Sequence, residues 1–209
     1  FGQLSHFYDQ AKDEWLFGHF GYDLKNEAET LSSNHTDRIG FSDLYFFVPQ
    51  WVIKLDREEV KVYGDGNHES VYKEIVQCSG VIKDDRPGKI NISHRINRED
   101  YLEIIEKLRR HILRGDCYEI NFCQEFFAVN AVIDPFSVYK KLSKVSPNPI
   151  SALYKLNDKW LICASPELFL KRKWPQILSQ PIKGTAKRIL NSAAEDQKSK
   201  VGLLNSAKD

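Results

Sequence analysis

The sequence predicts an α+β fold in which antiparallel β-sheets pack face to face and helices lie on the outside. Three observations favour this class. Most of the strand-like segments are joined by short turns, as in hairpins. The helical segments lie between these hairpins and do not alternate with single strands. The chain has 209 residues, 42% of them hydrophobic, which suffices for one large domain or two small ones.

Residues 1–90 are rich in aromatic side chains and form the predicted N-terminal β part. Residues 15–22 have the composition of a buried strand. Residues 44–56 and 59–63 are separated by a charged turn, so they are predicted to form a hairpin. A short helix over residues 69–78 is expected to follow these strands.

Residues 91–209 form the second predicted part, which we expect to be continuous with the first. Asn97 can cap a helix, with Asp100 three residues later as a variant of the capping box. Gly115 ends that helix. Asp134 begins another helix, whose first residue is proline. Apolar residues recur at helical spacing in both segments, so one face of each helix is expected to be buried.

Residues 117–129 alternate between apolar and polar side chains, which predicts a β-strand. Glu119 and Asn121 lie on its polar face. These two side chains could line a cavity or could simply face water. The pattern alone favours the second interpretation.

Two hairpins are predicted next, over residues 150–163 and 167–183. The first turns at Asn157 and the residue after it, and the second is centred near Trp174. A last helix is capped by Ser192, with a glutamate three residues later.

The second hairpin is predicted to bring an acid and an amine together. If it is symmetric about Trp174, Glu167 lies opposite Pro181, and Lys183 is a diagonal neighbour of Glu167 on the same face. A shift of one residue in register would place the two on opposite faces. A carboxyl group can act as general acid or base, and a deprotonated lysine is a nucleophile. Taken alone, such a pair is more often an inert surface salt bridge.

The residues around Lys183 suit a ligand site. Pro181 limits pairing at the strand end, Gly184 lets a ligand approach the backbone, and Thr185 offers a hydroxyl group.

The composition argues against several classes of partner. Lys and Arg number 30 and Asp and Glu 29, for a net charge of +1, so nothing favours nucleic acid or an anionic membrane. No apolar run is long enough to cross a bilayer. The 4 cysteines have no CxxC spacing and no histidine at a paired-ligand distance. We therefore expect reduced thiols in the cytoplasm and no metal site among these residues.

Both ends of the sequence suggest an internal piece of a longer protein. The chain begins at Phe1 without a methionine, and it stops at Asp209 within a helical pattern that has no stop signal.

Four segments resemble one enzyme family in their order and spacing. They are GDCYEINF at 115–122, SPELF at 165–169, PIKGT at 181–185 and NSAKD at 205–209. Together they are similar to the chorismate-binding family. Its members include anthranilate synthase component I, aminodeoxychorismate synthase component I, and the isochorismate and salicylate synthases. The resemblance is good over residues 97–209, and it implies the chorismate-binding fold, here incomplete.

The residue before Gly-Thr differs between branches of this family. Anthranilate synthases usually have Pro-Ile-Ala-Gly-Thr, whereas aminodeoxychorismate synthases have Pro-Ile-Lys-Gly-Thr, as this chain has at Lys183. The resemblance therefore implies amination of chorismate to 4-amino-4-deoxychorismate, a precursor of p-aminobenzoate and folate. Lys183 would be the nucleophile and Glu167 the general acid and base. A separate glutamine amidotransferase subunit would supply the ammonia.

The chain departs from the family in two respects. Glu119 stands where the ammonia-using branches usually have Gln and the isochorismate branch has a water-activating Lys, which argues against isochorismate chemistry. We still expect Glu119, Asn121, Gly184 and Thr185 to bind substrate. The family's glutamate ligands for Mg²⁺ and its catalytic histidine lie beyond Asp209. Mg²⁺ is thus expected only in the longer protein, and this piece alone is expected to be inactive.

Pro149, Ile150 and Ser151 match a segment that lines a tryptophan pocket in the family. Tryptophan is therefore a further candidate ligand, although a plain helix-to-strand turn would also explain these residues. Two alternatives to the formation of 4-amino-4-deoxychorismate remain open. One is anthranilate synthase component I, and the other is a catalytically silent family member that binds an amidotransferase.

Overall fold

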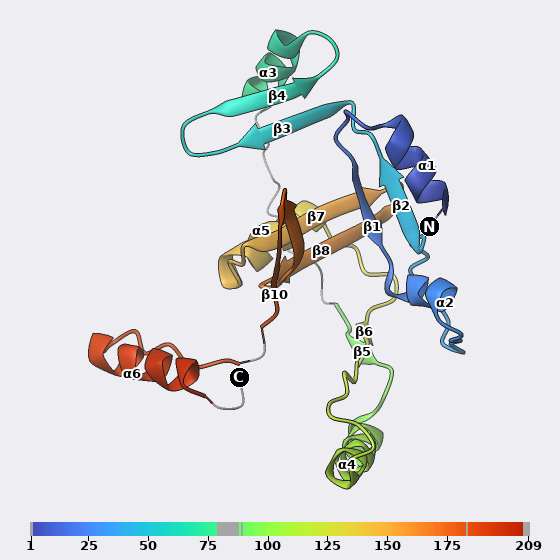
Figure 1. The fold of residues 1–209 in the computed structure, drawn as a ribbon, viewed down its shortest axis with the longest axis vertical. Helices are drawn as coiled ribbons and strands as arrows, with labels where there is room; N and C mark the ends of the chain where they lie inside the picture. Colours follow the sequence, from blue (N-terminus) through green and yellow to red (C-terminus); the bar gives the residue numbers. More distant parts are fainter. Residues whose placement is uncertain (1, 79–87, 89, 183, 207–209) are drawn as a thin grey trace. The chain divides into compact units, whose positions relative to one another are not determined.

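The computed structural model describes residues 2–78, 88, 90–182 and 184–206. Helices and antiparallel two-stranded ladders make up this part of the chain (Figure 1), which confirms the α+β class. Backbone contacts divide the chain into two compact units, residues 1–81 with 156–159, and residues 82–155 with 160–209. The domain boundary predicted at residue 90 stays a prediction.

In the first unit, the described residues form two ladders and several short helices. Strand β1 pairs with β2, and β3 pairs with β4, both antiparallel. The elements, in chain order, are α1 (Gly2–Gln10), β1 (Phe17–Phe20), the 3-10 helix η1 (Tyr22–Leu24), α2 (Lys25–Ala28), β2 (Leu44–Phe47), β3 (Trp51–Leu55), β4 (Val60–Gly64) and α3 (His68–Gln77).

The strand predicted within residues 15–22 and the helix predicted over 69–78 are confirmed as β1 and α3. The burial predicted for that strand is wrong, because β1 is largely exposed. The single strand predicted over residues 44–56 is wrong, because it is divided into β2 and β3 around Pro49. Proline has no N–H group to donate to a ladder, so a strand rarely continues through it. Helix α1 was not predicted. Its residues Leu4 and Tyr8 line a hollow together with aromatic side chains of β1 and β2.

The described residues of the second unit form three ladders and three longer helices. Strand β5 pairs with β6, β7 with β8, and β9 with β10. The elements, in chain order, are β5 (Ser93–His94), α4 (Arg98–Arg114), β6 (Phe126–Phe127), α5 (Pro135–Val145), β7 (Ile150–Leu156), β8 (Lys159–Ser165), β9 (Leu168–Lys173), β10 (Gln176–Gln180) and α6 (Ala193–Leu204).

The predicted helix caps are confirmed. The side-chain oxygen of Asn97 accepts the N–H of Asp100 at 2.8 Å, and α4 ends at Gly115, whose φ of 86° is left-handed. Asp134 caps α5, with proline at the first helical position. Ser192 accepts the N–H of the glutamate three residues later and so caps α6. Each cap satisfies N–H groups that a helix leaves free at its first turn.

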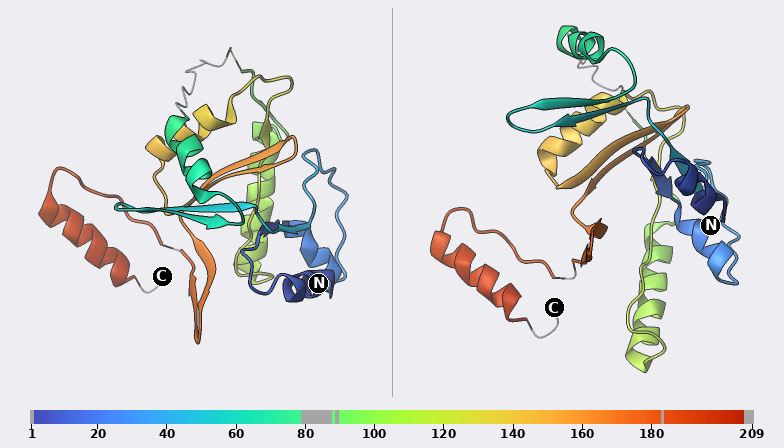
Figure 2. Two further views of the ribbon diagram at one scale, coloured as in Figure 1. Left: turned by 90° about the horizontal axis from the view of Figure 1, so that it is seen from above. Right: turned by 45° about the horizontal axis from the view of Figure 1, so that its top comes forward.

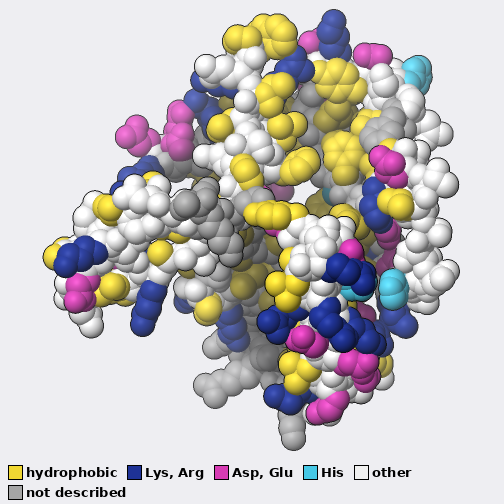
Figure 3. All heavy atoms as spheres, turned by 60° about the horizontal axis from the view of Figure 1, so that its bottom comes forward, with side chains coloured by type: hydrophobic (Ala, Val, Ile, Leu, Met, Phe, Trp, Pro, Cys, Tyr) yellow, Lys and Arg dark blue, Asp and Glu magenta, His cyan; other side chains and the backbone are white. Residues whose placement is uncertain are grey.

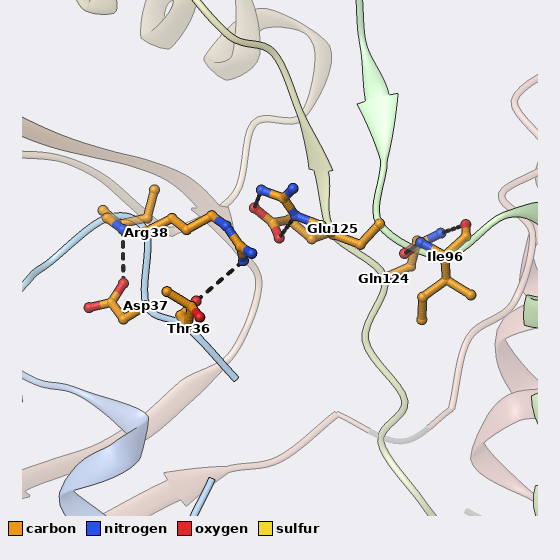
Figure 4. Close-up of polar contacts among 8 residues, drawn as sticks. Thr36, Asp37, Arg38, Ile96, Gln124 and Glu125 are labelled. Carbon is orange, nitrogen blue, oxygen red and sulfur yellow. Dashed lines mark hydrogen bonds and ion pairs between the residues drawn. The ribbon is translucent and has the colours of Figure 1, made fainter. Parts of the chain in front are cut away.

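The strand predicted over residues 117–129 is wrong, because only Phe126–Phe127 form a strand there, β6. A strand needs a neighbour to pair with, and the partner of this segment is β5, which is only two residues long. Side chains hold the segment instead. Gln124 accepts the N–H of Ile96 at 3.3 Å and donates to its carbonyl oxygen (Figure 4). Arg95 binds Glu125 at 2.6 Å.

The hairpin of β7 and β8 turns at Asn157, as predicted, and this residue has a left-handed φ of 54°. Helix α5 lies along this hairpin in the views of Figures 1 and 2. The rings of Phe136 and Trp160 meet there edge to face, with centroids 5.4 Å apart.

In the described part of the chain, only Ala11, Leu24 and Ser137 are buried. Large hydrophobic side chains therefore lie at the surface, among charged ones, on the face that Figure 3 shows. Phe169 is 88% exposed and Trp174 is 79% exposed.

Candidate functional site

The hairpin of β9 and β10 positions the start of the candidate site. Near its turn, Ile177 pairs with Arg172 and Leu178 pairs with Lys171, one residue away from the predicted register. Towards the open end, Gln180 pairs with Leu168. The register shifts because two residues of β9, Phe169 and Leu170, lie opposite the single residue Ser179, as in a β-bulge.

A hydrogen bond across the strands supports this bulge. The hydroxyl group of Ser179 donates to the carbonyl oxygen of Phe169 at 2.8 Å. The bulge restores the predicted register at the open end, since the next pair after Gln180 and Leu168 would join Pro181 and Glu167. The ladder itself ends at Gln180.

Glu167 lies directly before β9, and its side chain is exposed. A local turn holds its backbone, because its N–H donates to the hydroxyl oxygen of Ser165 at 3.3 Å and that hydroxyl lies 3.3 Å from its carbonyl oxygen. The carboxyl group is therefore accessible to a ligand at the open end of the hairpin.

Lys183 lies outside the described residues, so its predicted proximity to Glu167 stays a prediction. Gly184 and Thr185 follow in an irregular segment, in which Gly184 is half-buried and Thr185 is exposed.

The chain after Thr185 is held against α6 by contacts that the sequence did not predict. The guanidinium group of Arg188 binds the carboxylate of Asp196, with Nε 2.9 Å from Oδ1 and 3.0 Å from Oδ2. The N–H of Ile189 donates to the same carboxylate at 2.8 Å. Ser199 donates to the carbonyl oxygen of Lys187 at 2.8 Å. The sequence feature that could have indicated these contacts is an acidic residue in the first turn of α6, Asp196, shortly after the basic pair Lys187 and Arg188.

These contacts perturb the acid-base equilibrium of Asp196. The hydrogen bond from Arg188 and then that from the N–H of Ile189 hold the pKa of Asp196 below its ordinary value. The same ion pair raises the pKa of Arg188. Both groups are thus charged at neutral pH, and the ion pair persists there.

Glu119 and Asn121 are exposed and lie in the irregular segment before β6, so the strand face on which they were predicted is absent. Their predicted role in substrate binding stays a prediction. The hollow of about 330 Å³ near this segment is lined by other side chains, among them Tyr101, Gln124 and Phe126.

The predicted tryptophan segment lies at the start of β7, with Pro149 directly before the strand and Ile150 and Ser151 as its first two residues. Ser151 donates to the carbonyl oxygen of Asn148 at 2.7 Å, and the amide of Asn148 donates to Ser146 and to the carbonyl oxygen of Ala164. Pro149 and Ile150 are exposed and Ser151 is half-buried. The contacts describe an ordered turn, and its binding of tryptophan stays a prediction.

Among residues 2–78, 88, 90–182 and 184–206, no three His, Cys, Asp or Glu side chains gather as ligands for a metal ion. No helix in these described ranges is both long and apolar enough to cross a membrane.

The arrangement around the open end of β9 and β10 suits acid-base chemistry on a ligand held by the backbone. An accessible carboxyl group lies at one strand end, and a Gly-Thr segment follows the other strand. Glycine permits a close approach to the backbone, and threonine adds a donor and an acceptor.

The sequence is similar to those of known proteins. Residues 3–209 match the family model for chorismate binding enzyme. Aminodeoxychorismate synthase component 1 of Escherichia coli K12 is 30% identical over 196 residues, which cover 92% of this chain and 42% of that protein. Anthranilate synthase alpha subunit 1, chloroplastic, of Arabidopsis thaliana is 28% identical over 225 residues, which cover 93% of this chain and 37% of that protein.

The fold is also similar to a solved structure. The crystal structure of anthranilate synthase component I from Streptococcus pneumoniae TIGR4 matches with a TM-score of 0.73 and 24% identity, over 92% of this chain and 45% of that chain. This chain therefore spans less than half the length of these relatives. Because the family model matches nearly all of it, the chain belongs to the chorismate binding enzyme family.

Proposed function

We propose that the protein converts chorismate and ammonia into 4-amino-4-deoxychorismate, with Lys183 as the nucleophile and Glu167 as the general acid and base. The observation that supports this most is the segment Pro-Ile-Lys-Gly-Thr around Lys183, which resembles the aminodeoxychorismate synthase branch. The E. coli relative that is 30% identical has the name of that branch.

The proposed chemistry requires one amine and one carboxyl group. The Nζ atom of Lys183 forms a bond to C2 of chorismate, both ring double bonds shift by one position, and the C4–O bond breaks. Glu167 gives its proton to the leaving hydroxyl group, which departs as water. Ammonia then forms a bond to C4, both double bonds shift back, and the bond between C2 and lysine breaks. The carboxylate of Glu167 takes up the proton that ammonia loses. The exposure of Glu167 at the open end of the hairpin supports this role.

Several further features of the complete protein belong to the proposal. A glutamine amidotransferase subunit supplies ammonia, and the reaction takes place in the cytoplasm. Gly184, Thr185, Glu119 and Asn121 contact the substrate, and tryptophan binds at Pro149 to Ser151. Mg²⁺, when bound, neutralises carboxylate charge on chorismate. The described residues offer no ligand cluster for this ion, so no step above depends on it.

The test compares the complete wild-type protein with Lys183→Ala and Glu167→Gln, using chorismate and ammonium as substrates and chromatography to identify products. We expect the wild type to form 4-amino-4-deoxychorismate. Lys183→Ala should lose most of the activity, and Glu167→Gln should lose on the order of 10²–10⁴-fold. Lys173→Ala removes an exposed lysine near the turn of the same hairpin and should retain full activity. A Lys183→Ala variant as active as Lys173→Ala would contradict the mechanism.

Anthranilate synthase activity is the second candidate function. The Arabidopsis relative, 28% identical, supports it by its name, and Lys183 argues against it. The same chromatographic assay separates the two functions, because formation of anthranilate by the wild type would replace the first proposal with the second.

A further inference from the structure

The segment that follows the proposed substrate-binding residues Gly184 and Thr185 is held on α6 by one carboxylate. Asp196 accepts hydrogen bonds from the side chain of Arg188 at 2.9 and 3.0 Å and from the backbone N–H of Ile189 at 2.8 Å. A second guanidinium nitrogen of Arg188 also lies 2.9 Å from this carboxylate. The group thus fixes both a side chain and the backbone next to it.

The surroundings of Asp196 favour a fixed arrangement. Its side chain is only 24% exposed, whereas that of Arg188 is 77% exposed. Bonds between a guanidinium group and both oxygens of a carboxylate define direction as well as distance. The bond from Ser199 to the carbonyl oxygen of Lys187 holds the same segment at a second point on α6. With contacts at both Arg188 and Lys187, the segment cannot rotate about one contact without breaking the other.

The other end of the proposed site is held as well. The ladder of β9 and β10 fixes the chain as far as Gln180, which pairs with Leu168. Only residues 181–186 lie between this ladder and the contacts of Lys187 with α6. Gly184 and Thr185 thus lie only three and two residues before the contact of Lys187 with α6.

We propose that Asp196 is a positioning residue, which sets the place of Gly184 and Thr185 for chorismate by holding Arg188 and Ile189 on α6. This inference rests on the proposed function, because that function makes Gly184 and Thr185 substrate-binding residues. Asp196 acts through the backbone and has no contact with the substrate. Small displacements of a binding segment weaken binding and slow the reaction, because catalysis depends on orientation.

The test uses the complete protein and measures the affinity for chorismate by calorimetry, without ammonia. Asp196→Asn preserves the size of the side chain and an acceptor for Ile189 but removes the charge that binds Arg188. We expect the Kd for chorismate to rise about tenfold, and the amides of residues 184–189 to exchange hydrogen faster. Glu195→Gln makes the same chemical change one residue earlier on α6 and should leave both quantities as in the wild type.

Steady-state kinetics distinguish positioning from loss of folding. A variant that merely unfolds has fewer active molecules, so its apparent kcat falls while its KM values stay unchanged. Asp196→Asn should instead raise KM for chorismate and leave KM for ammonia unchanged. Arg188→Gln should have the same effect, and the double variant should be no worse than either single one, because both changes remove one interaction.

Each outcome decides between the two proposals. An unchanged Kd for chorismate in Asp196→Asn would overturn the positioning role and leave the proposed function intact. A wild type that makes anthranilate would overturn the proposed product, while the comparison of affinities would still decide the role of Asp196. A wild type that fails to bind chorismate would overturn both.

Discussion

Substitution of Gln124 tests how the segment before β6 is held. Its oxygen accepts the N–H of Ile96 at 3.3 Å, and its nitrogen donates to the carbonyl oxygen of the same residue (Figure 4). Gln124→Glu preserves the shape and the acceptor but replaces the donor by a carboxylate oxygen, which faces the carbonyl oxygen of Ile96. A part-buried carbonyl group that loses its partner costs about 1–3 kcal/mol.

This local cost converts into a measurable exchange rate. Since about 1.4 kcal/mol corresponds to a factor of ten, the protection of the Ile96 amide at neutral pH should fall about 5- to 150-fold, as 1–3 kcal/mol implies. Hydrogen exchange followed by NMR measures it. Gln176→Glu, at an exposed position of β10, is the matched control. Equal protection of Ile96 in Gln124→Glu and in this control would refute the explanation by side-chain pairing.

The pH dependence of the same variant has a definite sign. A protonated carboxyl group has a donor again and can bind the carbonyl oxygen of Ile96. The folded state therefore favours the protonated form and raises the pKa of the introduced group above the ordinary glutamic acid value of about 4.3. The regained stability is present below that ordinary value and is lost as pH rises through the raised pKa. Protection that does not recover on acidification would count against the proposed geometry.

Three further predictions concern the helices of the second unit. Gly202→Ala should stabilise α6 by about 0.5–1 kcal/mol, because the added Cβ meets nothing within 4 Å inside the helix. Gly115→Ala should destabilise α4 by about 1–2 kcal/mol, because its φ is +86° although the space is equally open. Denaturant titration of both variants checks these signs, and equal signs would contradict them. Asp134→Asn should preserve the cap of α5 but remove its sensitivity to acid. Bonds from the side chain and then the backbone of Ser137 lower the pKa of Asp134 from its ordinary value of 3.8. The contribution of the carboxylate is therefore present above that value and is lost as pH falls through the lowered pKa. Amide exchange at Ser137 in acid measures this, and an equal loss in Asp134→Asn would contradict it.

The sequence predicted those features of the fold that depend on neighbouring residues. Asn97, Asp134 and Ser192 each cap a helix through a residue two or three positions away, so the signal lies within one turn of sequence. The turn at Asn157 is equally local. In contrast, the prediction of a strand over residues 117–129 was wrong, because alternation indicates the faces of a strand but not the length of its partner.

The candidate site could be predicted only in part for the same reason. The position of Glu167 at the open end of a hairpin followed from counting residues about its turn, and the motif around Lys183 followed from resemblance. The binding of Arg188 by Asp196 joins residues eight positions apart across a bend. Many other acidic residues could have served as well, and nothing in the sequence chooses between them. The bulge opposite Ser179 could not be predicted either, since a symmetric hairpin fits the same residues.

That bulge decides the face of the hairpin to which Glu167 belongs. In a regular strand, residues 167, 169, 171 and 173 would share one face, and the carboxyl group would lie on the same side as Lys171 and Lys173. The additional residue of β9 opposite Ser179 reverses this alternation, so that Glu167 is assigned to the side opposite these two lysines. Glu167 thereby shares its face with Arg172 and not with the two lysines. Deletion of a single residue from β9 would return it to the face of the lysines without changing any residue of the proposed site.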